Sequence, residues 1–173
     1  MGFQPKSFKI HYNGSLHWVT STRACKDEFV YIYDSYSVID SSGRPRLAAS
    51  LQLQIAQIYH CASNEMPILL PEMSRQCNGV DCGLYAIATA TDLCFGNNPA
   101  ERNYDQSQMR AHLLKCILQQ HLDPFPATSI SRTNVLYYGL TVYCYCRKPA
   151  DDNMIECVLS RFFSLPLHFL QRR

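Results

Sequence analysis

Cys82 is the residue whose surroundings point most directly to chemistry. It stands where the glycine-containing stretch GVDCG gives way to a long apolar, alanine-rich segment, the position at which a loop becomes a helix. A helix N-terminus carries a partial positive charge and free N–H groups, and both stabilise a thiolate. The same position also suits a buried small residue, a metal ligand or half of a disulfide, so the cysteine alone leaves four interpretations open.

A nucleophilic cysteine needs a base and a group that orients the base. His17 begins one predicted strand and Asp34 ends the next, so their side chains lie close together if the strands pair antiparallel. Asp34 would then accept a hydrogen bond from one imidazole nitrogen, while the other nitrogen faces the thiol. The five other histidines could serve on chemistry alone, but only His17 has a carboxylate at a matching strand end. An ordinary half-buried histidine is the alternative interpretation.

Gln76 lies six residues before Cys82 in the same polar loop. Its side-chain amide could donate a hydrogen bond to a developing oxyanion beside the backbone N–H of Cys82. Taken alone, Gln76 is best explained as an ordinary loop glutamine. A catalytic role for it depends on its combination with His17, Asp34 and Cys82.

The elements that must position these residues begin with a β-hairpin. Residues 8–12 and 15–21 flank Asn13-Gly14, a dipeptide typical of tight two-residue turns. A two-residue turn would place Ile10 opposite His17. The β-branched and aromatic run at 28–33 predicts a third strand, and Asp34 follows it.

Apolar spacing and capping residues predict three helices and one further strand. Their ranges are 47–61, 82–95 and 105–121 for the helices and 66–70 for the strand. The middle helix is apolar almost all round and is expected to be central, while the last begins at Asp105, which with Gln108 resembles a capping box. The apolar stripe expected on the last helix consists of Met109, Leu113 and Ile117. This order of elements predicts the α+β class, with a mainly antiparallel sheet packed by helices.

Composition narrows the class of protein further. The chain has 173 residues, 47% of them hydrophobic, so it can bury a sizeable core. A net charge of +2 with scattered signs argues against direct nucleic-acid binding, and no apolar run approaches the about 20 residues of a membrane span. Nine cysteines without a signal peptide favour reduced thiols and an intracellular location, nuclear or cytoplasmic.

Four short motifs, taken in order, carry a resemblance to a known family. They are His17-Trp18, Tyr33-Asp34-Ser35, Gln76 and Asp81-Cys82-Gly83. Their types and spacings resemble the ubiquitin-like-protein-specific cysteine proteases of the SUMO and NEDD8 deconjugase type, whose fold is papain-like, or adenain-like. The resemblance covers residues 8–126. The stretch 81–118, which contains LCFG and YDQSQMRAHLLKCIL, is similar to protease modules of mobile-element-derived genes.

The resemblance implies a role for each residue of the constellation. His17 would be the general base, Asp34 its orienting partner, Cys82 the nucleophile and Gln76 the oxyanion donor. Trp18 would line a narrow tunnel that passes only a Gly-Gly tail, because glycine has no side chain; an aromatic ring that packs on the sheet is the alternative interpretation. The implied activity is cleavage of peptide or isopeptide bonds after Gly-Gly of a ubiquitin-like modifier, with the modifier or its conjugates as partner and no cofactor.

The chain also departs from the family pattern. Family members carry further helices and a second tunnel tryptophan before the first strand, whereas this sequence has one Trp and little upstream of Phe8. We therefore expect an N-terminally shortened catalytic domain. Two alternatives stay open: a processing protease of a mobile element that cuts other substrates, or a catalytically weak remnant that acts as a binding module.

The end of the chain carries a second resemblance. YCYCRKPADDNMIEC is similar to the start of a plant-homeodomain zinc finger, with Cys144, Cys146 and Cys157 as candidate ligands. Two zinc ions need further Cys and His ligands, which the rest of the tail lacks, so we expect no bound metal. The predicted organisation is a catalytic domain at 1–126, a linker at 127–142 and a degenerate or truncated finger-like tail at 143–173.

Overall fold

The computed structural model describes residues 5–14, 16–24, 28–36, 39–59, 61, 63–142, 154–156 and 164–166. Its helices are α1 (Ala49–Ile58), α2 (Cys82–Cys94) and α3 (Gln106–Gln119), with a short 3-10 turn, η1 (Pro99–Glu101). Its strands are β1 (Pro5–Tyr12), β2 (Trp18–Ala24), β3 (Val30–Tyr33), β4 (Glu65–Pro71), β5 (Arg102–Tyr104), β6 (Ala127–Ser129), β7 (Val135–Thr141), β8 (Met154–Glu156) and β9 (Ser164–Pro166).

A five-stranded sheet organises the fold, with strand order β1-β2-β3-β4-β7. Every neighbouring pair is antiparallel except β3 and β4, which are parallel. The α+β class with a mainly antiparallel sheet is therefore confirmed. Two small sheets, β5-β6 and β8-β9, complete the strand pairing of the described residues.

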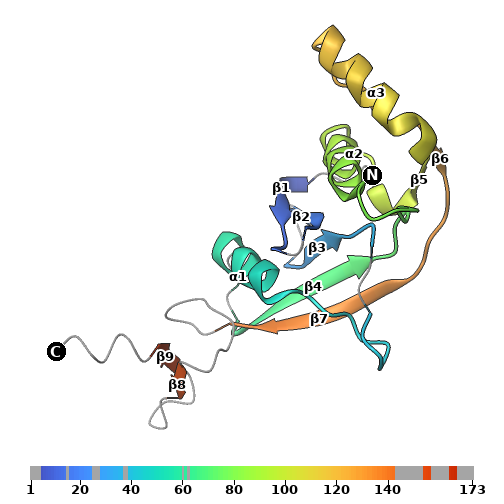
Figure 1. The fold of residues 1–173 in the computed structure, drawn as a ribbon. Coiled ribbons are helices and arrows are strands. Elements are labelled where there is room, and N and C mark those ends of the chain that lie inside the picture. The colour runs from blue at the N-terminus through green and yellow to red at the C-terminus, as the bar shows by residue number, and fades with distance from the viewer. Residues whose placement is uncertain are drawn as a thin grey trace.

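Helices cover both faces of the main sheet (Figure 1). Successive residues of a strand point to opposite faces, so Val30 and Ile32 of β3 pack with α1 residues such as Ile55 in one core. Tyr33 points to the other face, where it belongs to a second core with Tyr85 of α2 and residues of α3. The first turn of α2, which begins with Cys82, thus lies over the end of the sheet where β2 begins.

The hairpin register differs from the sequence prediction. Ile10 pairs with Thr20 rather than His17, and β1 and β2 are joined by residues 13–17, closed by a 2.9 Å bond from the Asn13 N–H to the His17 carbonyl. A two-residue type I′ turn needs a positive φ at both central residues. Gly14 has one, at +81°, but Asn13 does not, and Leu16 also has a positive φ, at +58°. His17 consequently sits at the end of the loop instead of within the ladder.

The predicted linker at 127–142 is also wrong. β6 pairs with β5, and β7 pairs with β4 along its whole length, from Val135 opposite Pro71 to Thr141 opposite Glu65. Leu140 and Val142 are buried in the core beneath α1. The polar residues of 128–134 obscure the β-branched and aromatic pattern of VLYYGLT that follows them. Residues 127–142 therefore belong to the folded unit.

The helices lie near their predicted positions, with two corrections. Asp105 caps α3 by accepting a hydrogen bond from the Ser107 N–H, and Met109 is buried as expected. Ile117, however, is 64% exposed, because the C-terminal half of α3 extends beyond the sheet and α2 (Figure 1). The apolar character of the middle helix also predicts that Cys94, at its far end, is inert packing, but as the last residue of α2 Cys94 is exposed.

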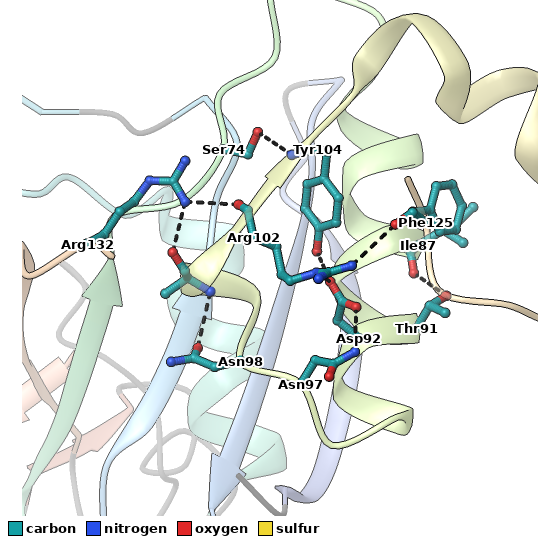
Figure 2. A network of polar contacts seen from close by, with 11 residues as sticks. Ser74, Ile87, Thr91, Asp92, Asn97, Asn98, Arg102, Tyr104, Phe125 and Arg132 are labelled. Carbon is teal, nitrogen blue, oxygen red and sulfur yellow. Dashed lines mark hydrogen bonds and ion pairs between the residues drawn. The ribbon is translucent and has the colours of Figure 1, made fainter. Parts of the chain in front are cut away.

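A buried polar network joins the end of α2 to β5 (Figure 2). The Asp92 side chain is fully buried and accepts hydrogen bonds from the Tyr104 hydroxyl at 2.7 Å and from Asn97 Nδ2 at 3.1 Å. Arg102 Nε lies 3.4 Å from the same carboxylate. A buried carboxylate requires such partners, so this network fixes α2 relative to β5 and the start of α3.

Candidate active site

His17 and Asp34 form the first contact of the candidate site. His17 precedes β2 and Asp34 follows β3, and the antiparallel pairing of Thr20 with Tyr33 brings these two ends together. The His17 Nε2 atom lies 2.7 Å from Asp34 Oδ1, and both side chains are largely buried. An ionised carboxylate only accepts hydrogen bonds, so Nε2 carries the proton of this bond. The Tyr36 N–H also donates to Asp34 Oδ1, at 2.8 Å, which fixes the carboxylate.

Cys82 reaches this pair from the N-terminus of α2. The hydrogen bond with Asp34 raises the pKa of His17; burial opposes this, while the negative charge of Asp34 and the hydrogen bond and charge of Cys82 add to the increase. Cys82 is therefore an interaction partner of the imidazole. Because Nε2 is engaged by Asp34, Nδ1 is the ring nitrogen left to take the thiol proton. Cys82, His17 and Asp34 thus lie in one region, as a thiol, a base and an orienting group must, since Cys82 Sγ contacts the residue before His17 and His17 bonds to Asp34.

The thiol itself is well covered. Cys82 is 5% exposed, and its Sγ donates to the carbonyl oxygen of Leu16 at 3.7 Å. Leu16, whose carbonyl contacts the sulfur atom, is 83% exposed, and Val80, two residues before Cys82, is also exposed. A substrate that reaches Cys82 has to displace the contact with the Leu16 carbonyl.

The start of α2 keeps backbone donors available beside the thiol. The first hydrogen bond of the helix runs from the Tyr85 N–H to the Asp81 carbonyl, at 3.0 Å. The N–H groups of residues 82–84 therefore have no partner within the helix. Asp81 occupies the N-cap position, but its side chain makes no capping hydrogen bond. Open N–H groups at this position can stabilise negative charge on a thiolate or on an oxyanion.

Gln76 lies beside the Asp34 end of the site. Its Oε1 accepts a hydrogen bond from the Ser35 hydroxyl at 2.7 Å, and its backbone N–H donates to the Ser35 carbonyl at 3.2 Å. Its Nε2 donates to the Asn78 carbonyl. An amide nitrogen carries two hydrogens, so one of them stays available for a further acceptor. Gln76 thus lies in the loop that leads to Cys82, and its hydrogen bonds join this loop to Ser35, the residue after Asp34.

Trp18 lies against the first turn of α2. Its Cδ1 atom would be 3.6 Å from a Cβ added at Gly83, and its ring packs on Tyr12 with centroids 5.2 Å apart. The absence of a side chain at Gly83 therefore leaves the indole close to the backbone beside Cys82. The ring is also partly exposed, so one surface of it is accessible to a ligand.

Three further residues hold the loop before Cys82, and sequence reasoning missed their role. The Asp81 side chain accepts hydrogen bonds from Asn78, Gln106 and Arg110, the last two on α3. Gln106 and Arg110 are four positions apart, so they share one face of that helix. In the sequence, only this spacing of four indicates that Gln106 and Arg110 act together, and it does not indicate which part of the protein they contact.

A cavity of about 310 Å³ borders Asp34. Its walls come from the ends of β3 and β4 and the start of β7, and neither His17 nor Cys82 lines it. The candidate site is therefore the surface around Cys82 and Trp18 rather than this cavity.

The sequence offers three candidate zinc ligands in the tail of the chain. Cys144, Cys146 and Cys157 lie outside the described residues. Elsewhere, within the part of the chain that the structure describes, no group of three His, Cys, Asp or Glu side chains is arranged to hold a metal ion. Among those same residues, no helix combines the length and apolar character needed to cross a membrane.

Comparison with known proteins does not assign the chain. No model of a protein family matches the sequence, and no curated protein sequence matches it. The site geometry and the motif resemblance are therefore the basis for inferring a function.

Proposed function

We propose that the protein is a cysteine peptidase of the ubiquitin-like-protein-specific type, with a papain-like, adenain-like catalytic domain. The observation that carries the proposal is the 2.7 Å bond between His17 Nε2 and Asp34, with Cys82 at a helix N-terminus and its Sγ in contact with the carbonyl of Leu16, the residue before His17. A satisfied structural histidine needs no cysteine partner. This arrangement instead matches the activated nucleophile of thiol hydrolases.

In the proposed reaction, His17 Nδ1 accepts the thiol proton of Cys82 and the resulting thiolate attacks the carbonyl carbon of the scissile bond. The oxyanion that forms is stabilised by the Cys82 backbone N–H and the free amide hydrogen of Gln76. Protonated His17 then donates its proton to the leaving amine, which leaves a thioester on Cys82. Water attacks the thioester while His17 takes its proton, and the acid product departs as the proton returns to the thiol.

The proposed substrate is a peptide or isopeptide bond that follows Gly-Gly of a ubiquitin-like modifier. The proximity of the Trp18 ring to Gly83 supports a narrow approach to the thiol, which glycine passes because it has no side chain. Exposed apolar residues beside the site, such as Leu16 and Val80, provide surface for the body of a protein substrate. A mobile-element processing protease would use the same chemistry without the Gly-Gly preference.

A second candidate function is a binding module without turnover. The 5% exposure of Cys82 and its contact with the Leu16 carbonyl favour this alternative, because a thiol held in this way is not open to substrate. The two functions differ in one property, which is whether the contact between the Cys82 thiol and the Leu16 carbonyl breaks when a substrate binds.

Hydrolysis of fluorogenic peptides tests the proposal. We expect release of the fluorophore from a peptide ending in Gly-Gly-aminocoumarin, no release with Cys82→Ser, and at least tenfold slower release when the penultimate glycine is replaced by leucine. Cleavage of a peptide library without glycine preference would support the processing protease. Absence of any cleavage, with Cys82 no more reactive than a free thiol, would support the binding module.

A further inference from the structure

The side chain of Asp81 makes contacts that are unusual for its position. Aspartate at a helix N-cap ordinarily accepts a hydrogen bond from an N–H group of the first turn. Asp81 makes no such bond and turns toward α3, where Gln106 Nε2 donates to its Oδ2 at 2.7 Å and Arg110 forms an ion pair with its Oδ1. Asn78 Nδ2 donates to Oδ2 from the other side, also at 2.7 Å. The carboxylate is buried.

We propose that Gln106 and Arg110 are positioning residues that hold Asp81 away from the N-terminus of α2, so that the N–H groups beside Cys82 stay open during the reaction. We call this set, Asp81 with Gln106 and Arg110, the α3 latch. The inference rests on the proposed function, since open N–H groups matter only if Cys82 is a nucleophile. Without the latch, the Asp81 carboxylate is free to cap the helix and to place a negative charge where the thiolate and the oxyanion develop.

The latch also fixes the loop that carries Gln76. Gln106 Oε1 accepts hydrogen bonds from the Cys77 N–H at 2.8 Å and from the Tyr85 hydroxyl at 3.1 Å. Asn78 Oδ1 accepts from the N–H groups of Val80, at 3.0 Å, and Asp81, at 3.1 Å. The loop from Cys77 to Asp81 is thus hydrogen-bonded to itself, to α2 and to α3.

The charge of Asp81 is stable over the working pH range. Burial raises the pKa of Asp81, but the hydrogen bonds from Asn78 and Gln106 and the charge of Arg110 outweigh burial and lower it. The carboxylate is therefore ionised near neutral pH. An ionised group that swings to the helix N-terminus brings a full charge with it, so its position matters for the chemistry.

Charge reversal at Arg110 tests the latch. Arg110 is 68% exposed, so Arg110→Glu leaves the core intact while the introduced carboxylate repels Asp81 from α3. We expect Arg110→Glu to lower two rates by about tenfold or more: kcat for the Gly-Gly peptide, and the rate at which iodoacetamide alkylates Cys82, which peptide mapping locates. KM should stay within twofold. The size of the effect is that of losing a hydrogen bond to a charged group. Lys115→Glu, which makes a charge change of the same size on the same helix, should alter both rates less than twofold.

A double variant separates positioning from a structural role. Asp81→Ala added to Arg110→Glu removes the carboxylate that would cap the helix, so we expect at least a threefold recovery of kcat over Arg110→Glu alone. A structural role predicts that the double variant is no faster than Arg110→Glu, and that result would overturn the inference. Gln106→Met, which removes the other α3 donor to Asp81, is the second test if Arg110→Glu does not fold; wild-type rates in Gln106→Met would also overturn it.

Failure of the latch is distinguishable from failure of the proposed function. If wild-type Cys82 reacts no faster than the exposed Cys77 and no peptide is cleaved, the proposed function fails and the latch fails with it. If the wild-type protein is reactive and Arg110→Glu stays within twofold of it, only the latch fails.

Discussion

The contact between His17 and Asp34 makes a quantitative prediction for Asp34→Asn. This substitution keeps the shape of the side chain and removes its charge. In the structure Asp34 is bonded to His17 Nε2 at 2.7 Å and is the main reason that the pKa of His17 is raised. The variant should therefore bind a proton on His17 less tightly, so that the imidazolium that accompanies the Cys82 thiolate becomes less favourable.

The size of the effect follows from the type of hydrogen bond that is lost. A hydrogen bond to a charged group contributes about 1.5–3 kcal/mol, and one between neutral groups about 0.5–1.5 kcal/mol. Exchanging one for the other removes about 1–1.5 kcal/mol of imidazolium stabilisation, which corresponds to roughly a five- to twelvefold lower rate at 1.36 kcal/mol per factor of ten. Both side chains are largely buried, so screening by solvent reduces this figure little.

Alkylation of Cys82 by iodoacetamide at pH 7, followed by peptide mapping, measures the effect without a substrate. Asp123→Asn is the matched control, because Asp123 forms an ion pair with His121 at 3.2 Å on the exposed surface. We expect the control to change the rate less than twofold. The contradicting result has two parts: Cys82 of Asp34→Asn is alkylated at a rate within twofold of wild type, and an NMR titration shows that the pKa of His17 has fallen. The reactivity of Cys82 would then not depend on the His17–Asp34 pair.

Three further predictions concern stability. Tyr104→Phe removes the 2.7 Å bond to the buried Asp92 and should lower the free energy of unfolding in urea by about 1–3 kcal/mol; an unchanged midpoint would contradict the importance of this network. Met109→Ala should cost about 2–5 kcal/mol, whereas Leu118→Ala on the exposed part of the same helix should cost less than about 1 kcal/mol, and equal losses would contradict the packing of α3. Burial lowers the pKa of His11 from 6.5, so the unfolded chain binds the proton more tightly than the folded chain. The difference in unfolding free energy between wild type and His11→Gln should therefore shrink as the pH falls from 7.5 to 5. A constant difference would show that His11 is not buried in its neutral form.

The position of the His17–Asp34 pair could be predicted because it depends on local signals. A β-branched and aromatic run identifies β3, and antiparallel pairing then brings the end of β3 to the start of β2. The register of β1 against β2 could not be predicted in the same way. The Asn13-Gly14 dipeptide is typical of a tight turn, yet the connection extends to His17 because a second left-handed residue, Leu16, follows.

The features that sequence reasoning missed depend on contacts between distant segments. β7 completes the sheet by pairing with β4, although its own stretch follows a polar run that resembles a linker. Gln106 and Arg110 reach the loop before Cys82 only because α3 begins beside this loop. No local sequence pattern in α3 indicates that the loop lies there. Side-chain types and short spacings indicated Cys82 and His17 as the proposed nucleophile and base, whereas the groups that hold them in place depend on the packing of distant segments.

The central claim is that Cys82 attacks the carbonyl of a Gly-Gly tail with the help of His17. Incubation of the full chain with a panel of ubiquitin-like proteins that carry a C-terminal vinyl methyl ester, followed by intact-mass measurement and peptide mapping, tests this claim most directly. We expect a covalent adduct on Cys82 with at least one member of the panel, at least tenfold slower adduct formation in His17→Ala and none in Cys82→Ala. No adduct on Cys82 with any member, from protein whose folding is verified by a cooperative unfolding transition, would contradict it.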